Sequence, residues 1–486
     1  MRASSTDGAT GAPLSPFAPL AAGALPPPLQ CRPSDTVLAV MAQLDATRAD
    51  AIVVVDPDTG VPLGIVTLRD ILKRVAMAGV DIAAPVATIM TGGLITLPVE
   101  TTAHQASVVM LRRGVRHLVL VDARGALAAL VSQADLFVGA GGTSADLVAR
   151  IGAAGGIATL VDVAGEVHRF SRQLLDQGLS PAAMQHRVSS LDDLIALRAI
   201  DLVAERHELP YVPWCWLAFG SEGRFERTLS TDQDNGLIFL AASDAEADAL
   251  RAAFLPFARE VNRVLDACGF RLCRGNVMAG NPQLCLSLDE WQRKFGEWLE
   301  TTDPQAILNA TIFFDFRPLC GDERLAAVLR QWLLSRTPQA GRLLRAMVEG
   351  TLNWPSPLGW LSSFRCDDDP EFPHSIDLKL HGVRPFVDAA RIWALAHGVA
   401  ATNTAERLRG VASRLNLSGQ DIAAFVAAMD HVQRLRFDRQ LTCDDDRGAN
   451  RVDPDQLNAL DREVLKESFR QAKRIQQLLE IEFLRS

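Results

Sequence analysis

The chain has 486 residues, of which 48% are hydrophobic and 22% charged, as is typical of an ordinary soluble protein with about three domains. A formal net charge of −9 and an aromatic content of 6% argue against a surface that coats nucleic acid, but a single positive pocket for a nucleotide stays compatible with them. No apolar run reaches the roughly 18 residues of a membrane span, the N-terminus does not resemble a signal peptide, and the cysteines include no CxxC pair. These features predict a cytoplasmic protein without a membrane partner, a zinc site of the usual spacing or a disulfide framework.

An internal repeat organises the first third of the chain. Residues 1–30 are rich in Pro, Ala, Gly and Ser and are expected to be disordered. Beyond them, residues 49–72 align with residues 115–137, and a helical stretch precedes each segment. Each segment holds two apolar strands joined by a turn, followed by a Thr or Ser three residues before an Asp. The repeat therefore predicts two β-α-β-β-α units within residues 31–140.

The two units resemble a tandem CBS domain pair, a fold that commonly binds adenosine nucleotides between its repeats. In that family the Thr/Ser-x-x-Asp element contacts the ribose and the phosphates of the nucleotide. The resemblance therefore implies AMP, ADP or ATP as a regulator and four ligand residues: Thr67, Asp70, Ser132 and Asp135. A simpler interpretation needs no ligand, because the two hydroxyl residues can be helix N-caps and the two aspartates can complement the helix dipole.

Residues 141–210 are predicted to form a helical linker region. The sequence GAGGT at 139–143 predicts a flexible hinge, and apolar residues then recur at helical spacing over 144–208. Pro210 and Pro213 end the last helix. These helices join the repeat to the next domain and are the natural conduit for coupling between the two.

The segment WLAFGSEGRFERTLSTDQDNGLIF, residues 216–239, carries the most chemistry. It predicts a strand, a glycine-containing turn, a charged connection and a second strand that begins with Asp232 and Asp234, which point to the same side of an extended backbone. Two neighbouring carboxylates repel unless a divalent cation lies between them, and Mg²⁺ prefers oxygen ligands and substrate phosphates. Gly220-Ser221 forms an open turn whose backbone N–H groups can approach a phosphate. The alternative is an acidic turn with solvated aspartates.

Phe219-Gly220-Ser221, ten further residues and then Asp232-Gln233-Asp234 resemble the signature of the DNA polymerase β-like nucleotidyltransferase superfamily. The longer string GSEGRFERTLSTDQDN is similar to a narrower family, the nucleotidyltransferases found beside CBS domains in bacterial signalling proteins, which are distant relatives of the PII uridylyltransferases. The resemblance implies a multidomain α/β plus all-α protein. Its parts would be the tandem CBS pair, a polymerase β-like α/β domain over 211–336 and a helical substrate-binding domain over 337–486.

The same resemblance implies a reaction and roles for the residues of the motif. Asp232 and Asp234 would be catalytic and would bind Mg²⁺ (or Mn²⁺), so that a nucleoside monophosphate passes from a nucleoside triphosphate to a PII-like protein or a small molecule. Gly220 and Ser221 would hold the phosphates. Two arginines would add charge-assisted contacts to phosphate oxygens, namely Arg224 and Arg227. Alternatively, these arginines are solvated and balance the charges of two nearby glutamates, Glu222 and Glu226.

A third carboxylate usually lies on a later strand in this superfamily, and its place is open here. Residues 269–291 predict a β-hairpin that leads into a helix, but the strand 270–278 contains no acid. The candidates are Asp289 and Asp315, and we favour Asp315 as a catalytic residue, although IFFDF also suits a buried ion pair with Arg317. Without a third acid, the alternative is a catalytically silent adenine-nucleotide sensor that acts through a partner protein.

Beyond residue 337 the chain is predicted to be helical. Four helical stretches predict a four-helix bundle, with Ser418 and Asp453 as N-caps. The segment HSIDLKLHGVRP gathers several charged residues, and we expect Lys379 or Arg384 to reach a phosphate of the nucleotide. The alternative is an internal network of salt bridges. Because CBS pairs often associate, the resemblance also implies a homodimer.

Overall fold

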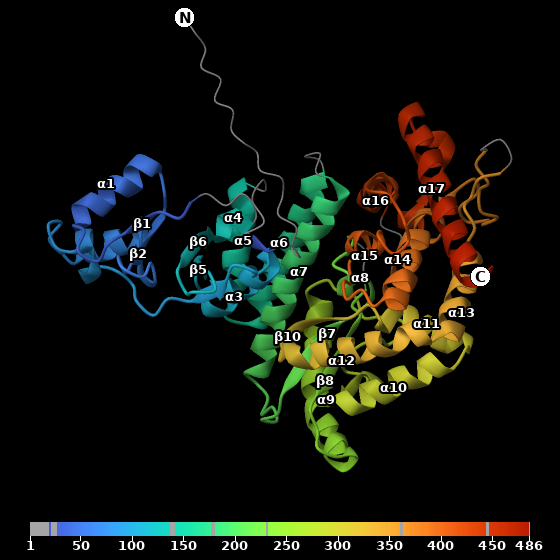
Figure 1. Cartoon of the computed structure of the whole chain (residues 1–486), viewed down its shortest axis with the longest axis horizontal. Helices are drawn as coiled ribbons and strands as arrows, with labels where there is room; N and C mark the ends of the chain where they lie inside the picture. The colour runs from blue at the N-terminus through green and yellow to red at the C-terminus, as the bar shows by residue number, and fades with distance from the viewer. Residues whose placement is uncertain are drawn as a thin grey trace, which may run out of the picture. The chain divides into compact units, whose positions relative to one another are not determined.

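The computed structural model describes residues 19–20, 27–136, 141–175, 180–229, 232–359, 363–443 and 447–485. The chain forms two compact units, Met1–Ala153 and Ala154–Ser486 (Figure 1). Most of the segment predicted to be disordered, and part of the predicted hinge at 139–143, lie outside the described residues. None of the helices in those described ranges is long and apolar enough to cross a membrane.

The first unit contains two similar halves, as the internal repeat predicts. Each half has a three-stranded sheet in which a short first strand pairs parallel to the second, and the second pairs antiparallel to the third. One helix precedes the second strand in each half, and the elements are β1 (Gln30–Cys31), α1 (Val37–Thr47), β2 (Ala51–Val55), β3 (Pro62–Thr67), β4 (Thr96–Pro98), α3 (Ala103–Arg113), β5 (His117–Val121) and β6 (Leu127–Ser132).

The two halves share part of their core. Val53 and Val55 on β2 and Val119 on β5 are buried together in one apolar cluster. The third strand of each half leads directly into a helix, and these helices are α2 (Leu68–Asp70), which continues as the π-helical turn η2 (Ile71–Met77), and α4 (Gln133–Leu136). The unit ends with α5 (Gly141–Ala153). The β2–β3 and β5–β6 connections therefore place the two Thr/Ser-x-x-Asp elements at equivalent positions.

The second unit is built around a four-stranded sheet in the order β10-β7-β8-β9. The strands are β7 (Trp214–Ala218), β8 (Asn235–Phe239), β9 (Cys285–Ser287) and β10 (Arg317–Gly321). β7 lies between β10 and β8 and pairs antiparallel with both, whereas β9 pairs parallel with β8. Helices surround the sheet, and they include α6 (Ile157–Leu175), α7 (Pro181–Ala204), α9 (Asp244–Ala267), α10 (Leu288–Glu300), α11 (Pro304–Phe313) and α12 (Glu323–Arg336).

The predicted β-hairpin over 269–291 is wrong. Only Cys285–Ser287 is a strand, and the residues before it run in turns. Side-chain amides replace ladder partners there, because the Ala279 N–H donates to Asn235 Oδ1 at 2.8 Å and the Gly280 N–H donates to Asn262 Oδ1 at 2.9 Å. The positive φ of Asn276 also interrupts the extended chain.

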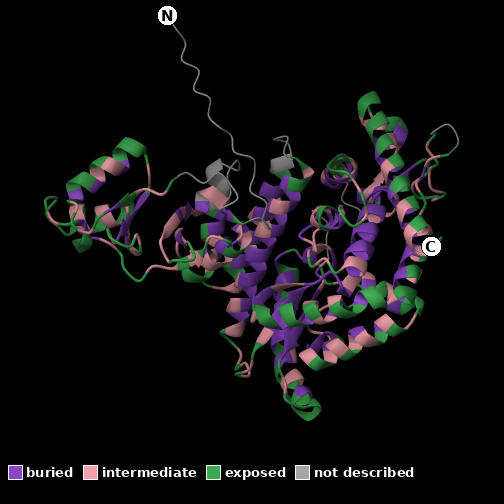
Figure 2. Cartoon of the chain, viewed as in Figure 1, coloured by how far each residue is buried: buried purple, intermediate pink, exposed green. Residues whose placement is uncertain are grey.

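The predicted linker region does not form a separate layer. Its second and third helices, α6 and α7, belong to the same compact unit as the sheet. Residues are buried along nearly the whole length of α7, as Figure 2 shows, and α7 packs against α9 and β10. The helices therefore form part of the support for the sheet.

The C-terminal region is helical, as predicted. Its helices are α13 (Gly341–Leu352), the π-helical turn η7 (Lys379–Val383), α14 (Arg384–His397), α15 (Thr404–Val411), α16 (Gly419–Thr442) and α17 (Ala459–Leu484). Ser418 caps α16 in a capping box with Asp421, which confirms that prediction. Asp453 instead caps a short 3₁₀ turn, and the N-cap of α17 is Asn458, whose side chain accepts the Asp461 N–H at 2.9 Å.

Candidate active site

The glycine turn after β7 lies directly against the Asp-x-Asp segment. Gly220 begins the one-turn helix α8 (Gly220–Gly223) with φ of +57°, a conformation that favours glycine. A Cβ atom on Gly220 would lie 3.4 Å from Asp234 Oδ2, and the Phe219 N–H donates to the Asp234 carbonyl at 2.9 Å. The turn and the carboxylate are therefore held together by backbone contacts.

Asp232 and Asp234 line one cleft of about 600 Å³, together with Ser221. They lie in the extended segment just before β8, rather than on the strand itself. Gln233 between them is buried and donates to the carbonyls of Asn262 and Phe270, so the side chains alternate as an extended backbone requires. The structure thus brings the two carboxylates to the same cleft, as predicted.

The two carboxylates have different surroundings. Asp234 is largely enclosed, and burial raises its pKa although a hydrogen bond from the Cys273 thiol and the charge of Arg227 oppose the shift. The Asp232 side chain is 37% exposed, and its Oδ1 lies 3.4 Å from the Arg271 guanidinium. Removing bulk water from Asp234 leaves its negative charge poorly compensated, which favours binding of a cation beside it.

One wall of the cleft comes from the helical region. Lys379 and Arg384, both predicted to reach a phosphate, line this wall. Arg384 is already engaged, because its Nε donates to Asp388 Oδ2 at 3.1 Å and its guanidinium lies 5.4 Å from the centre of the Trp354 ring. For Lys379 the structure shows no ion pair with any described residue. An apolar side of the cleft is formed by α11 residues, including Leu308 and Ile312.

Asp315 is fully buried and contacts arginines instead of the cleft. Its carboxylate lies 2.8 Å from both Arg224 and Arg391 and 2.6 Å from Arg407. Burial alone would raise the pKa of Asp315, but the three guanidinium charges hold it well below its usual range. The expected ion pair between Asp315 and Arg317 does not form. The structure therefore shows Asp315 as the shared partner of three arginines. Asp315 does not line the cleft in which the predicted catalytic role would require it.

Arg317 pairs instead with α7, where Asp193 Oδ1 lies 2.7 Å away. The backbone of Asp315 packs closely against α8. A Cβ atom added to Gly223 of that helix would lie 1.9 Å from the Asp315 carbonyl oxygen. The Arg317 Nε donates to the Glu222 carbonyl at 2.8 Å. The two side chains of the Asp-Phe-Arg sequence therefore serve different parts of the structure.

The two arginines of the motif also differ from the prediction. Arg224 lines the cleft, but its guanidinium lies 2.8 Å from Glu226 and 2.8 Å from Asp315. Arg227 is 4% exposed and does not line the cleft, because it pairs with Glu222 at 2.9 Å and with Asp192 of α7 at 3.5 Å. The contacts agree with the alternative interpretation, in which the two arginines balance the charges of Glu222 and Glu226. That interpretation expected solvated side chains, however, and these ion pairs are buried.

Glu222 is a component that the sequence reasoning left without a clear role. Its Oε1 accepts the Asp234 N–H at 3.4 Å, and burial raises its pKa to about 7 while the charge of Arg227 opposes the rise. Glu222, Arg227 and Asp192 thus form a buried ionic support beneath Asp234. A usable signal was present in the sequence, because Asp192-Asp193 lies directly between the apolar residues Leu191 and Leu194.

Arg436 was also missed by the sequence reasoning. It lies on α16, lines the cleft and is 6% exposed. Its neighbours in the sequence, Leu435 and Phe437, are buried as well. An arginine between two apolar residues of a helix is the signal that could have found it.

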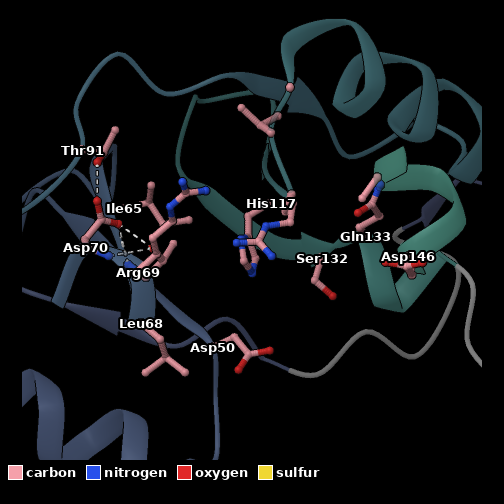
Figure 3. A pocket seen from close by; sticks show the side chains of 15 residues that line it. Asp50, Ile65, Leu68, Arg69, Asp70, Thr91, His117, Ser132, Gln133 and Asp146 are labelled. Carbon is pink, nitrogen blue, oxygen red and sulfur yellow. Dashed lines mark hydrogen bonds between the residues drawn. The ribbon is translucent and has the colours of Figure 1, made fainter. Parts of the chain in front are cut away.

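The first unit contains a second cleft, of about 630 Å³, lined by Thr67, Asp70 and Ser132. In Figure 3, Asp70 and Thr91 lie on one side of this cleft, and His117, Ser132 and Gln133 lie on the other. Asp135, the fourth predicted ligand residue, does not line the cleft. Two arginines and a histidine also line it, namely Arg69, Arg116 and His117, together with the carboxylates of Asp50 and Asp146.

The Thr/Ser-x-x-Asp elements form helix caps in both halves. Asp70 Oδ2 accepts the Thr67 N–H at 2.9 Å and the Thr67 hydroxyl at 2.6 Å. Asp135 Oδ2 accepts the equivalent groups of Ser132, both at 2.7 Å. The N-cap interpretation therefore describes the geometry, and a ligand in this cleft would meet hydroxyls that already donate to a carboxylate.

The carboxylate pair suits a cation that takes most of its ligands from elsewhere. Over the described ranges, no group of three or more His, Cys, Asp and Glu side chains is arranged to hold a metal ion. Asp232 and Asp234 supply only two carboxylates. Mg²⁺ commonly binds through one or two carboxylates with water and substrate phosphates completing its shell, so the residues present fit such an ion.

Comparisons with known proteins assign each region. The family described as "Putative nucleotidyltransferase DUF294" matches residues 165–305, the "Putative nucleotidyltransferase substrate binding domain" matches 341–483, and the CBS domain matches 23–77 and 86–139. Among curated proteins, an uncharacterized 17.7 kDa protein of Acidianus ambivalens is 32% identical over 105 residues, which are 22% of this chain and 62% of that protein.

Solved structures of CBS-domain proteins match part of the chain. A CBS domain protein of Pyrobaculum aerophilum, complexed with AMP, has 30% sequence identity, with a TM-score of 0.21, and the match covers 22% of this chain and 82% of that one. A CBS-domain-containing protein of Agrobacterium tumefaciens has 29% identity with a TM-score of 0.21, and the match covers 23% of this chain and 86% of that one.

Proposed function

This chain belongs to the DUF294 nucleotidyltransferases that carry a CBS domain pair, and we propose that it transfers a nucleoside monophosphate from a nucleoside triphosphate to an acceptor. The acceptor is a PII-like protein or a small molecule, and the reaction uses Mg²⁺ (or Mn²⁺). The observation that supports the proposal is the shared cleft, in which Asp232, Asp234 and Ser221 face a wall supplied by the substrate-binding domain.

In this proposal the chain's own residues bind and orient the nucleotide. Asp232 and Asp234 hold the divalent cation, and the turn at Gly220-Ser221 holds a phosphate beside them. A bound Mg²⁺ neutralises phosphate charge and makes an acceptor hydroxyl more acidic. The buried support of Glu222 and Arg227 keeps Asp234 in place, and the enclosed position of Asp234 strengthens its attraction for a cation.

A second function, binding of a nucleotide without turnover, is favoured by one observation. The other carboxylates that line the cleft are engaged with arginines, since Glu226 lies 2.8 Å from Arg224 and Asp388 lies 2.7 Å from Arg391. Apart from the two aspartates assigned to the cation, every carboxylate among the cleft residues that the structure describes is therefore paired with an arginine. A general base would then have to come from the acceptor or from solvent.

A labelling experiment separates the two functions. Each of the four nucleoside triphosphates, labelled on the α-phosphate, is incubated with the full chain, Mg²⁺ and candidate acceptors, and both label transfer and pyrophosphate release are measured. We expect transfer in the wild type and its loss in Asp232→Asn and Asp234→Asn, with Asp244→Asn as a matched surface control that retains it. Transfer that survives both cleft substitutions would refute the assignment, and nucleotide binding without any transfer would establish the silent sensor.

For the first unit we propose that the CBS cleft binds an adenine nucleotide. Thr67, Asp70 and Ser132 line it, and Arg69 and Arg116 supply positive charge for phosphate. Isothermal titration of the full chain with AMP, ADP and ATP tests this proposal, and Arg116→Gln should weaken binding at least about tenfold. Arg124→Gln, at a turn away from the cleft, should leave it unchanged. Absence of any binding at millimolar nucleotide would contradict the proposal.

A further inference from the structure

One buried arginine of the active-site cleft has only neutral partners. The Arg436 Nη1 donates to Gln433 Oε1 at 2.6 Å, and its Nε and Nη2 donate to Asn450 Oδ1 at 3.0 and 2.8 Å. The structure places no carboxylate of the described residues within ion-pair distance of Arg436. Burial lowers the pKa of this guanidinium to about 10, the negative charge of Asp377 opposes the shift only in part, and the charge of Arg224 adds to it. A buried, uncompensated charge is costly unless a ligand neutralises it.

Lys379 is the second cation on this wall for which the structure shows no ion pair with a described residue. It belongs to the π-helical turn η7, an irregularity often found at functional sites. Its side chain is accessible from the cleft, yet surrounding protein displaces enough water to lower its pKa, and the charge of Arg436 lowers it further. Opposing these effects are the negative charges of Asp377 and Asp234. Lys379 therefore lies within electrostatic reach of both Arg436 and the metal-binding aspartate.

The neighbouring arginines on this wall differ, because each has a carboxylate. Arg384 pairs with Asp388 at 3.1 Å, and Arg391 pairs with Asp388 at 2.7 Å and with Asp315 at 2.8 Å. Structural ion pairs thus account for Arg384 and Arg391 but leave Lys379 and Arg436 unexplained. A single bound carboxylate would neutralise only one of them, whereas a polyphosphate carries several charges along its length.

We propose that Lys379 and Arg436 form the binding site for the phosphate chain of the nucleoside triphosphate, so that the helical substrate-binding domain holds the polyphosphate while Asp232 and Asp234 hold its cation. This inference rests on the proposed function and names the part of the nucleotide that the helical wall of the cleft binds. Lys379 acts as a point charge, and the planar guanidinium of Arg436, oriented by Gln433 and Asn450, presents its remaining N–H groups to phosphate oxygens.

Inorganic triphosphate tests the proposal without requiring catalysis. Its binding to the full chain in the presence of Mg²⁺ is measured by isothermal titration calorimetry. We expect Lys379→Gln and Arg436→Gln each to weaken binding about ten- to a hundredfold. Arg436→Lys should recover only part of the loss, because lysine lacks the planar fork. Matched controls are Arg434→Gln on the same helix and Lys466→Gln on α17, neither of which lines the cleft; both should bind as the wild type does.

The outcomes separate this inference from the proposed function. Binding of triphosphate that is unchanged in both cleft variants, or undetectable in the wild type, overturns the inference. Any additional binding at the CBS cleft persists in all variants and does not hide the loss. If Arg436→Gln fails to fold, the accessible Lys379→Gln still decides the question. Triphosphate binding that needs both residues, in a chain without detectable transfer, supports this site and removes the proposed transferase activity.

Discussion

Removing the charge of Asp315 should destabilise the second unit strongly. In Asp315→Asn, Arg224 keeps Glu226 as a partner and Arg391 keeps Asp388, but Arg407 loses its only ion pair among the described residues. Arg407 is 1% exposed, so its charge would remain buried without a counter-charge. Breaking one partner of a buried ion pair typically costs about 3–5 kcal/mol, and we expect the free energy of unfolding to fall by that amount.

The assay is urea unfolding followed by tryptophan fluorescence. All 8 tryptophans lie between residues 214 and 393, so the signal reports the second unit without a contribution from the first. The matched control is Asp244→Asn, which removes a well-exposed pair with Arg293 and should leave the urea midpoint almost unchanged. The double variant Asp315→Asn/Arg407→Gln should recover part of the loss, because the unpaired charge is gone.

The pH dependence supplies a further check on the same variant. The pKa of Asp315 is depressed in the folded state, so its contribution is fully present above its unfolded value of about 3.9 and is lost as the pH falls below it. The stability difference between wild type and Asp315→Asn should therefore be constant from about pH 5 to 8 and shrink only in stronger acid. A loss below about 1 kcal/mol at neutral pH would refute the reasoning.

Two other substitutions test the packing and electrostatics around the cleft. Gly223→Ala would place a Cβ 1.9 Å from the Asp315 carbonyl oxygen and should lower the free energy of unfolding by at least about 3 kcal/mol. Gly350→Ala in α13, where a Cβ would meet open space, should raise it by about 0.5–1 kcal/mol. Equal urea midpoints for the two variants would contradict this prediction. Burial and then the charge of Glu226 raise the pKa of Asp430 to about 6, so the wild type loses stability as the pH rises from about 4 to 6. Asp430→Asn should therefore be more stable than the wild type by about 1–2 kcal/mol at pH 7.5 and equal to it near pH 4, and a reversed sign would exclude the assignment.

The elements that could be predicted from the sequence are those set by local patterns. Alternation of side chains along an extended segment places Asp232 and Asp234 on one side. The positive φ of Gly220 is favoured because glycine has no Cβ atom. The repeat in the first unit was predictable because its two halves carry the same order of strands, turn and cap. Each of these signals can be seen in the order of residues along the chain, without knowledge of tertiary contacts.

Predictions failed where the partner of a side chain lies far away in the sequence. Asp315 was paired with Arg317 two positions later, but its partners Arg224 and Arg391 are 91 and 76 residues away. The hairpin at 269–291 failed because Asn235 and Asn262 accept backbone N–H groups that a strand would have used. The apolar neighbours of Arg436 signal a buried arginine, but only the fold places that arginine in the same cleft as the two aspartates.

Binding of Mn²⁺ tests the central claim, that Asp232 and Asp234 jointly hold a divalent cation for a nucleotide, most directly. Electron paramagnetic resonance of free Mn²⁺ is recorded with the full chain and a non-hydrolysable nucleoside triphosphate. The account predicts that the wild type removes Mn²⁺ from solution and that Asp232→Asn and Asp234→Asn each weaken this binding at least about tenfold. Equal Mn²⁺ binding by the wild type and both variants, with folding intact, would contradict the account.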